Sequence, residues 1–244
     1  MAKIIKQTRF TLVSKRNIKL YTFYAVAEIM LVVVGILLAM QVSDWSEEQK
    51  RKEQLQNIYK ALYKDLKNDK NKIQEITTLF EKNKNHYENI LNGNVSRSRY
   101  AQDKSYSHIL LRHTYFSVNK RGFNLLQNHL DASFATNDSL NDHIIQFYTE
   151  NIHKIERVRE MMNKEHDYVI QKWADKYAWF YKLNEKKLSS DYLDFLMNDP
   201  RFKNDVLTRK NRIYLNFVPT LKAYEKQTDE ILTILEKKHI KKIE

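Results

Sequence analysis

The chain has 244 residues, enough for one domain with attachments or for two small domains. It contains 3 Gly, 2 Pro and no Cys, which excludes disulfides, zinc–thiolate sites and cysteine nucleophiles and disfavours loop-rich or many-stranded folds. The net charge is +12, and residues 1–20 contribute +6 of it through six basic residues and no acid. This composition predicts an all-α protein with long helices and few connections.

Residues 21–42 are almost continuously apolar, and Glu28 is the one charged residue among them. A helix rises 1.5 Å per residue, so this segment spans about 33 Å, enough for a hydrocarbon core of about 30 Å. Tyr21 and Trp45 flank it, as aromatic residues do at membrane interfaces. A cleaved signal peptide is the main alternative, but residues 39–44 make a poor cleavage site. We therefore predict a single transmembrane helix.

The basic residues on either side of this segment predict its orientation. Six precede it, whereas Asp44, Glu47 and Glu48 follow it before the first basic cluster at residues 50–52. The more basic short flank of a membrane helix stays in the cytoplasm. We expect residues 1–20 in the cytoplasm and residues 43–244 outside it, in the periplasm of a Gram-negative cell whose inner membrane holds the helix.

An acid inside an apolar membrane segment needs a reason, because a charge at the bilayer centre costs about 2.5–3.5 kcal/mol on insertion scales. Gly35 lies two helical turns beyond Glu28 on the same face, and Ala39 and Ser43 follow at four-residue steps. Small residues at this spacing let membrane helices approach closely. The stripe therefore predicts contact with a second copy or with another envelope protein. Two alternatives stay open: Glu28 snorkels to the cytoplasmic headgroups, or it takes part in proton or ion coupling.

A long helix is predicted beyond the apolar segment, because apolar residues recur every seven positions over 55–90 without Gly or Pro. Asp69 and Asn83 interrupt one line of this repeat. One interpretation packs the face inside a monomeric bundle. The other makes it the seam of a coiled-coil homo-oligomer in which Asp69 and Asn83 set the register. Large aromatic residues such as Tyr59 and Phe80 favour the bundle.

The rest of the chain predicts further helices. A loop is expected over 92–107, a second connection over 182–190, and helices over 108–118, 120–130, 138–181, 191–198 and from 200 to about 240. Asp199 should cap the last helix, and Pro200 suits its first turn. Pro219 should bend that helix near Leu215, whose carbonyl loses its donor. The whole is predicted as an antiparallel bundle of three long helices plus short ones.

The search for chemical motifs finds little. Glu-x-x-His occurs at Glu150/His153 and Glu236/His239, on a polar helix side and in a Lys-rich tail, so no metal or other cofactor is expected. Nucleophile-elbow, phosphate-loop and dinucleotide motifs are missing from the sequence, and we expect no enzyme activity. Glu165-His166-Asp167 and the basic cluster from Arg209 to Arg212 are interpreted as solvated surface, and no nucleic-acid partner is expected.

The apolar segment, YAVAEIMLVVVGILLAMQVSDW from Tyr24 to Trp45, resembles the start of uncharacterised membrane-anchored proteins of Bacteroidota that carry a GEI-LVV-GILIAL-INNW segment. The matching residues are Glu28, Gly35, Gln41 and Trp45, whereas Ala27 and Ser43-Asp44 depart from the pattern. Looser similarity extends to Leu62-x-x-Asp65-Leu66-x-x-Asp69 and Asp199-Pro-Arg201-Phe202-x-Asn204. The resemblance implies a single-span protein of a bacterial envelope and carries over no catalytic or binding residue.

Two functions fit these expectations. The first is a membrane-anchored helical interaction or scaffold protein, a subunit of an envelope complex. The second is a sensor-like periplasmic module that signals through a membrane partner. Only about 20 residues are predicted on the cytoplasmic side, too few for a signalling domain, which favours the scaffold.

Overall fold

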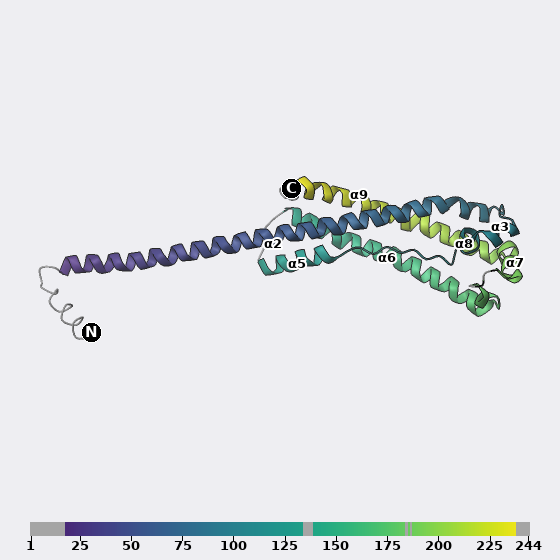
Figure 1. Ribbon diagram of the computed structural model, residues 1–244, viewed down its shortest axis with the longest axis horizontal. Coiled ribbons are helices and arrows are strands. Elements are labelled where there is room, and N and C mark those ends of the chain that lie inside the picture. The colour runs from purple at the N-terminus through teal and green to yellow at the C-terminus, as the bar shows by residue number, and fades with distance from the viewer. Residues whose placement is uncertain (1–17, 134–138, 184, 186, 238–244) are drawn as a thin grey trace. The chain divides into compact units, whose positions relative to one another are not determined.

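A computed structural model describes residues 18–133, 139–183, 185 and 187–237 of the chain (Figure 1). The described residues form helices and connections without any strand, which confirms the all-helical class. The elements are α2 (Ile18–Leu91), α3 (Arg97–Gln102), α4 (Lys104–Ser107), α5 (Arg121–Ser133), α6 (Ser139–Lys176), the 3₁₀-helix η1 (Phe180–Lys182), α7 (Ser190–Asn198), α8 (Pro200–Asn211), the π-helix η2 (Arg212–Phe217) and α9 (Val218–Leu235). The chain divides into two compact units, Met1–Leu55 and Gln56–Glu244.

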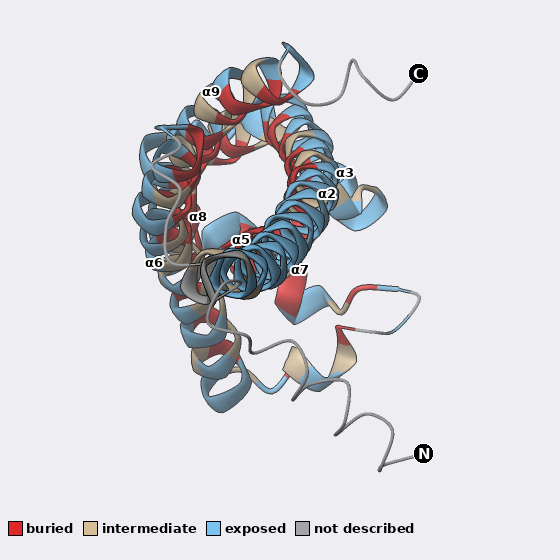
Figure 2. Ribbon diagram, turned by 90° about the vertical axis from the view of Figure 1, so that its left-hand side faces the viewer, coloured by how far each residue is buried: buried red, intermediate tan, exposed pale blue. Residues whose placement is uncertain are grey.

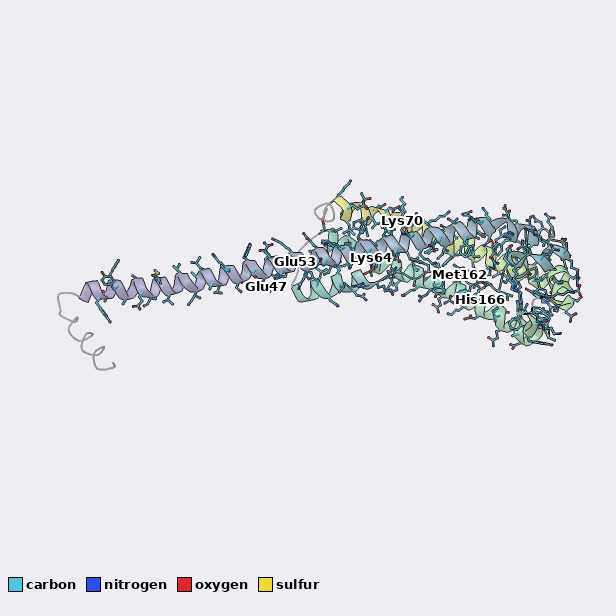
Figure 3. All side chains as sticks on the ribbon, in the orientation of Figure 1. Glu47, Glu53, Lys64, Lys70, Met162 and His166 are labelled. Atoms are coloured by element: carbon cyan, nitrogen blue, oxygen red, sulfur yellow. The ribbon has the colours of Figure 1, made fainter. Side chains whose placement is uncertain are left out.

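In the first unit the described residues all belong to α2. The apolar stretch 21–42 is helical throughout, and the helix continues without a break through the polar residues beyond it. On this polar part, Glu48 pairs with Lys52 at 2.6 Å, a spacing of four residues that supports an exposed helix. Side chains such as Glu47 and Glu53 project from the helix (Figure 3).

In the second unit, hydrogen bonds between helices show how the long elements run. Residues of α2 pair with residues of decreasing number in the C-cap of α9, in α9 and in α8: Tyr63 with Glu236, Lys70 with Asp229, Gln74 with Glu225 and Glu88 with Lys210. The α6 helix does the same, through Asn151 with Gln227, Glu165 with Arg209 and Lys172 with Asp205. Within this unit α2 and α6 are therefore each antiparallel to α8 and α9, and the buried sides of α6 and α9 face inward (Figure 2).

The segment between α4 and α5 differs from its prediction. Residues 108–118 were expected to form a helix, but the chain makes a turn at 108–111 and then has no regular structure up to Lys120. Phe116 and Val118 are buried while Tyr115 and Ser117 are exposed. This alternation is the two-residue period of an extended chain, and tertiary contacts stabilise it over the helix. The extended segment brings the start of α5 back alongside the middle of α2 (Figure 1).

The start of α8 confirms its prediction. Asp199 accepts a hydrogen bond from the backbone N–H of Arg201 at 2.9 Å, and Pro200 occupies the first turn of α8. At Leu215, where a bend was predicted, the chain forms the π-helix η2, in which the N–H of Val218 bonds to the carbonyl of Ile213. Because Pro219 has no N–H to donate, a wider turn before it shifts the hydrogen-bond register.

Candidate functional site

The first candidate site is the exposed apolar stretch of α2. Its large apolar side chains are all exposed, from 43% at Val33 to 76% at Leu31. Tyr21–Leu91 is one helix long and apolar enough to cross a membrane, and none of the residues in its most apolar window is buried. A helix that is apolar on every side is suited to a nonpolar solvent. A helix on the surface of a soluble protein is instead apolar only on the face that packs against the core.

The predicted contact stripe lies on this stretch. Glu28, Gly35, Ala39 and Ser43 are all exposed, and the helical geometry keeps them on one side because seven residues make nearly two turns. A Cβ atom added at Gly35 would meet no atom within 4 Å. Nothing in the described part of the chain covers the stripe, and its role in helix contact stays a prediction.

Asp69, predicted as a register residue, lies in the interior of the second unit with 1% of its surface exposed. It accepts hydrogen bonds from the backbone N–H of Asn119 at 3.1 Å, from the Asn119 side chain and from the Tyr224 hydroxyl at 2.8 Å. Burial raises the pKa of Asp69 to about 6, although these bonds oppose the rise. The chain itself thus supplies the partners of this carboxylate, and its role in an oligomer is untested.

Asp65 lies one helical turn before Asp69 on α2 and contacts the same part of the chain, where the extended segment leads into α5. It accepts a hydrogen bond from the backbone N–H of Gly122 at 2.7 Å, in the first turn of α5, where N–H groups lack helical partners. A Cβ at Gly122 would lie 2.6 Å from the backbone nitrogen of Leu62, so only glycine permits this approach. Asp65 and Asp69 together fix the start of α5 on α2.

Asn83, the second predicted register residue, is half-buried and lies 3.2 Å from His86 Nδ1 on the same helix. The structure does not bring it together with Asp69, because the two residues are 14 positions, or about 21 Å, apart along α2. Its contribution to a coiled-coil seam likewise stays a prediction.

The most deeply buried ion pair of the described chain was interpreted from the sequence as surface, which is wrong. Glu165 accepts a hydrogen bond from Arg209 Nε, and the two side chains are 3% and 2% exposed. Arg209 also donates to the carbonyls of Arg112 and Leu110, at 3.2 and 3.4 Å. The other carboxylate oxygen, Glu165 Oε1, is buried and receives no hydrogen bond from the described residues. Glu165 also lines a cavity of about 200 Å³.

The sequence does contain a signal that Glu165 is buried. Val158, Met162, Glu165, Val169 and Trp173 recur at three- and four-residue steps and are all buried, so Glu165 lies on the apolar face of α6. A charged residue on such a face needs a partner inside the protein, and Arg209 supplies it. No spacing in the sequence identifies Arg209, which is 44 residues away.

Two histidines lie beside the pair. His166, one turn after Met162 on α6 (Figure 3), stacks on His113 with ring centroids 4.7 Å apart. Burial lowers the pKa of His166, and Arg209 and His113 lower it further. Over the described ranges, no three His, Asp or Glu side chains are grouped to hold a metal ion. Of the weighed Glu-x-x-His motifs, Glu150 instead pairs with Lys154, and His239 lies outside the described residues.

A wider, open hollow of about 690 Å³ is lined by Tyr177 and Trp179, which precede η1, and by residues of α7 and the start of α8. The aromatic rings that line the hollow already contact other side chains. Tyr177 stacks on Trp179 with ring centroids 4.9 Å apart, and the Arg201 guanidinium lies over the Tyr177 ring, 5.9 Å from its centroid. Two of the three acids that line it are engaged as well, since Asp199 pairs with Arg201 and Asp194 with Arg97. Most of the aromatic and charged groups around this hollow therefore already have partners within the protein.

Comparison with known proteins gives one match. A family model described as a family of unknown function, DUF6090, matches residues 28–97. The match begins at Glu28 and includes the Leu62-to-Asp69 motif, so it covers the stripe and the carboxylates that hold α5, but it leaves out α6 and α8. No curated protein and no solved structure matches the chain.

Proposed function

We propose that this protein is a single-span membrane protein of a bacterial envelope whose helical unit serves as an interaction or scaffold subunit of a membrane complex. In this proposal residues 1–20 lie in the cytoplasm, the apolar part of α2 crosses the inner membrane, and the unit from Gln56 onward lies in the periplasm as a helical bundle.

The exposed apolar stretch carries this proposal. Fifteen large apolar side chains between Tyr21 and Val42 are exposed, and burying each in a nonpolar phase stabilises by about 1.5–3 kcal/mol. Lipid is the environment that buries all sides of such a helix at once. The excess of six basic residues on the N-terminal flank supports the orientation.

The stripe supports an interaction role rather than a passive anchor. Glu28 is costly in lipid unless another group meets it, and the small residues at Gly35 and Ala39 permit a second helix to come close. The same stripe suits a homo-oligomer or a different membrane protein, and both are interactions within the membrane.

A reporter fusion tests the topology. Alkaline phosphatase or β-lactamase joined after Glu244 is expected to be active, because both enzymes report an extracytoplasmic location. Activity only from a cytoplasmic reporter at the same position would overturn the orientation.

Crosslinking in native membranes tests the interaction. We expect a crosslinked species that is lost in Glu28→Leu and Gly35→Leu, since both changes remove features of the stripe. Val33→Leu is the matched control, because it adds one methylene group on the opposite side of the helix. Association that is unchanged in both stripe variants would leave Glu28 as a snorkelling residue and overturn the contact surface.

A further inference from the structure

We infer that residues 110–114 form an acid-sensitive flap, which is released from α6 and α8 when the stacked side chains of His113 and His166 become protonated. The flap, as we name these residues, runs from the turn after α4 into the extended segment before α5. Its release would expose interior surface of the second unit in response to a fall in pH. The inference rests on the second unit alone, and its failure would leave the proposed membrane role intact.

Contacts from two helices hold the flap. His113 of the flap stacks on His166 of α6, with ring centroids 4.7 Å apart and the ring planes inclined by 29°. From α8, the buried Arg209 guanidinium donates hydrogen bonds to two flap carbonyls, those of Arg112 at 3.2 Å and Leu110 at 3.4 Å. Because the flap belongs to no helix, these side-chain contacts rather than a helical hydrogen-bond ladder hold it in place.

A small, largely enclosed hollow of about 50 Å³ lies against the flap, whose residues Arg112 and Thr114 form part of its wall. Tyr87 of α2 and Met162 of α6 line the same hollow, and these residues are 3% and 1% exposed. Met162 lies one helical turn before His166 (Figure 3). Movement of the flap away from α6 would therefore give solvent access to Met162, which is otherwise buried.

The histidine pair is suited to its uncharged form. Nδ1 of His113 and Nδ1 of His166 are both buried, and neither has a hydrogen-bond partner in the described part of the chain. A protonated imidazole carries a hydrogen on both ring nitrogens, so protonation would leave a buried N–H at Nδ1 without an acceptor. Such a buried donor is costly, and two imidazolium rings this close also repel each other. The closed flap therefore favours the uncharged pair, whereas the released flap, whose rings reach water, favours the charged pair.

The charges around the pair act mainly in the same direction. Burial lowers the pKa of His166 most, and Arg209 of α8 and His113 of the flap lower it further. Asp167 of α6 and the backbone of Leu110 oppose this shift in pKa. A histidine whose pKa is lowered in the closed form binds fewer protons there than in the released form. The closed form therefore loses stability as the pH falls below about 6.5, the ordinary pKa of histidine.

Other titratable groups lie near the flap. Glu165 of α6 is paired with Arg209, so it adds no net charge beside the histidines. His108, just before the flap, also has a pKa that is lowered, chiefly by burial. Asp69 of α2 holds Asn119 beyond the flap, and burial raises its pKa, so its effect on stability has the opposite sign. Global unfolding would mix these effects, and the test therefore has to report on the flap itself and remove the pair selectively.

Thiol labelling of the full chain in detergent tests the flap, because the chain has no cysteine of its own. Met162→Cys places a single thiol in the hollow that the flap covers. We expect its rate of reaction with dithiodipyridine to rise by about tenfold or more between pH 7.5 and about pH 5, relative to the same variant unfolded in urea at each pH. A relative rate that stays constant over this range would overturn the inference.

Histidine variants on the Met162→Cys background assign the effect. His166→Phe and His113→Phe each keep an aromatic ring in the stack but cannot be protonated, so each is expected to reduce the rise severalfold or abolish it. His153→Phe, the same change at an exposed histidine of α6, is the matched control and should leave the rise intact. A full rise in both stack variants would assign the pH dependence to another group and overturn the inference.

A second thiol position tests whether the change is confined to the flap. Ile231→Cys replaces a fully buried residue of α9 that does not line the hollow. We expect its relative labelling rate to change by less than about twofold over the same pH range, because the flap does not have to move to protect it. An equal rise at this position and at Met162→Cys would mean that the whole unit loosens in acid, and it would overturn the inference.

Discussion

The two parts of α2 are both rich in apolar residues, yet they bury them differently. Over 21–42 the helix is apolar on all sides, and its large apolar side chains are exposed. Over 56–91 the apolar residues form one face, and Leu62, Leu66 and Ile73 on it are fully buried. The pattern around the helix, rather than its apolar content, therefore distinguishes a segment suited to lipid from one that packs on protein.

The largest expected effect is on a side chain of the packed part. Leu66→Ala should lower the free energy of unfolding of the second unit by about 2–5 kcal/mol, because it leaves a cavity at a fully buried position. Leu37→Ala, the same change in the exposed part, should alter it by less than about 0.5 kcal/mol. Urea unfolding followed through the buried Trp173 measures both; equal losses would erase the distinction between the two parts.

The next effect concerns the buried acid of the packed part. Because burial raises the pKa of Asp69 from 3.8 to about 6, the folded state holds its proton where the unfolded state has released it. Between pH 4 and 6 this group should therefore lower stability as pH rises, by up to about 3 kcal/mol. Asp69→Asn should remove this part of the slope, as unfolding curves of both proteins across this range would show. An identical slope in the variant would contradict the raised pKa.

The smallest expected effect compares two glycines. Gly122→Ala should destabilise by about 1–3 kcal/mol, because the new methyl group would meet the backbone of Leu62 at 2.6 Å. Gly35→Ala has open space around it and should leave the unfolding of the second unit unchanged, while favouring the helix locally by up to about 1 kcal/mol. A tolerated Gly122→Ala would show that α5 shifts readily on α2.

A second contrast, between buried carboxylates, shows where sequence reasoning stops. Asp69 was predicted as an interruption of an apolar repeat, and such an interruption is visible in one sequence. Glu165 was interpreted as surface because it stands in a row of titratable residues with His166 and Asp167. The spacing of the apolar residues predicts that Glu165 lies on the apolar face of α6. It does not predict that one carboxylate oxygen lacks a hydrogen-bond donor, because that depends on which donors the fold brings near.

Local structure was largely predictable because it depends on residues that are close in sequence. The extended segment was not predictable because it depends on residues that are distant in sequence. The apolar stretch, the helix caps at Asp199 and Pro200 and the long helices depend on residues within a few positions of one another. Residues 112–120 are extended because Asn119 and Gly122 bond to Asp69 and Asp65, which lie 50 and 57 positions earlier. Their own propensities do not require that conformation.

The sequence by itself therefore determined the helical class, the apolar segment with its acid and small-residue stripe, and the asymmetry of charge around it, because each is a pattern of neighbouring residues. Only the tertiary structure decided that Asp69 accepts hydrogen bonds from Asn119 and Tyr224, which lie 50 and 155 positions away. It also decided that Arg209 donates to one carboxylate oxygen of Glu165, while the other receives no hydrogen bond from the described residues. A buried polar group is satisfied by whatever the folded chain places beside it, and that placement joins residues whose separation in sequence carries no signal.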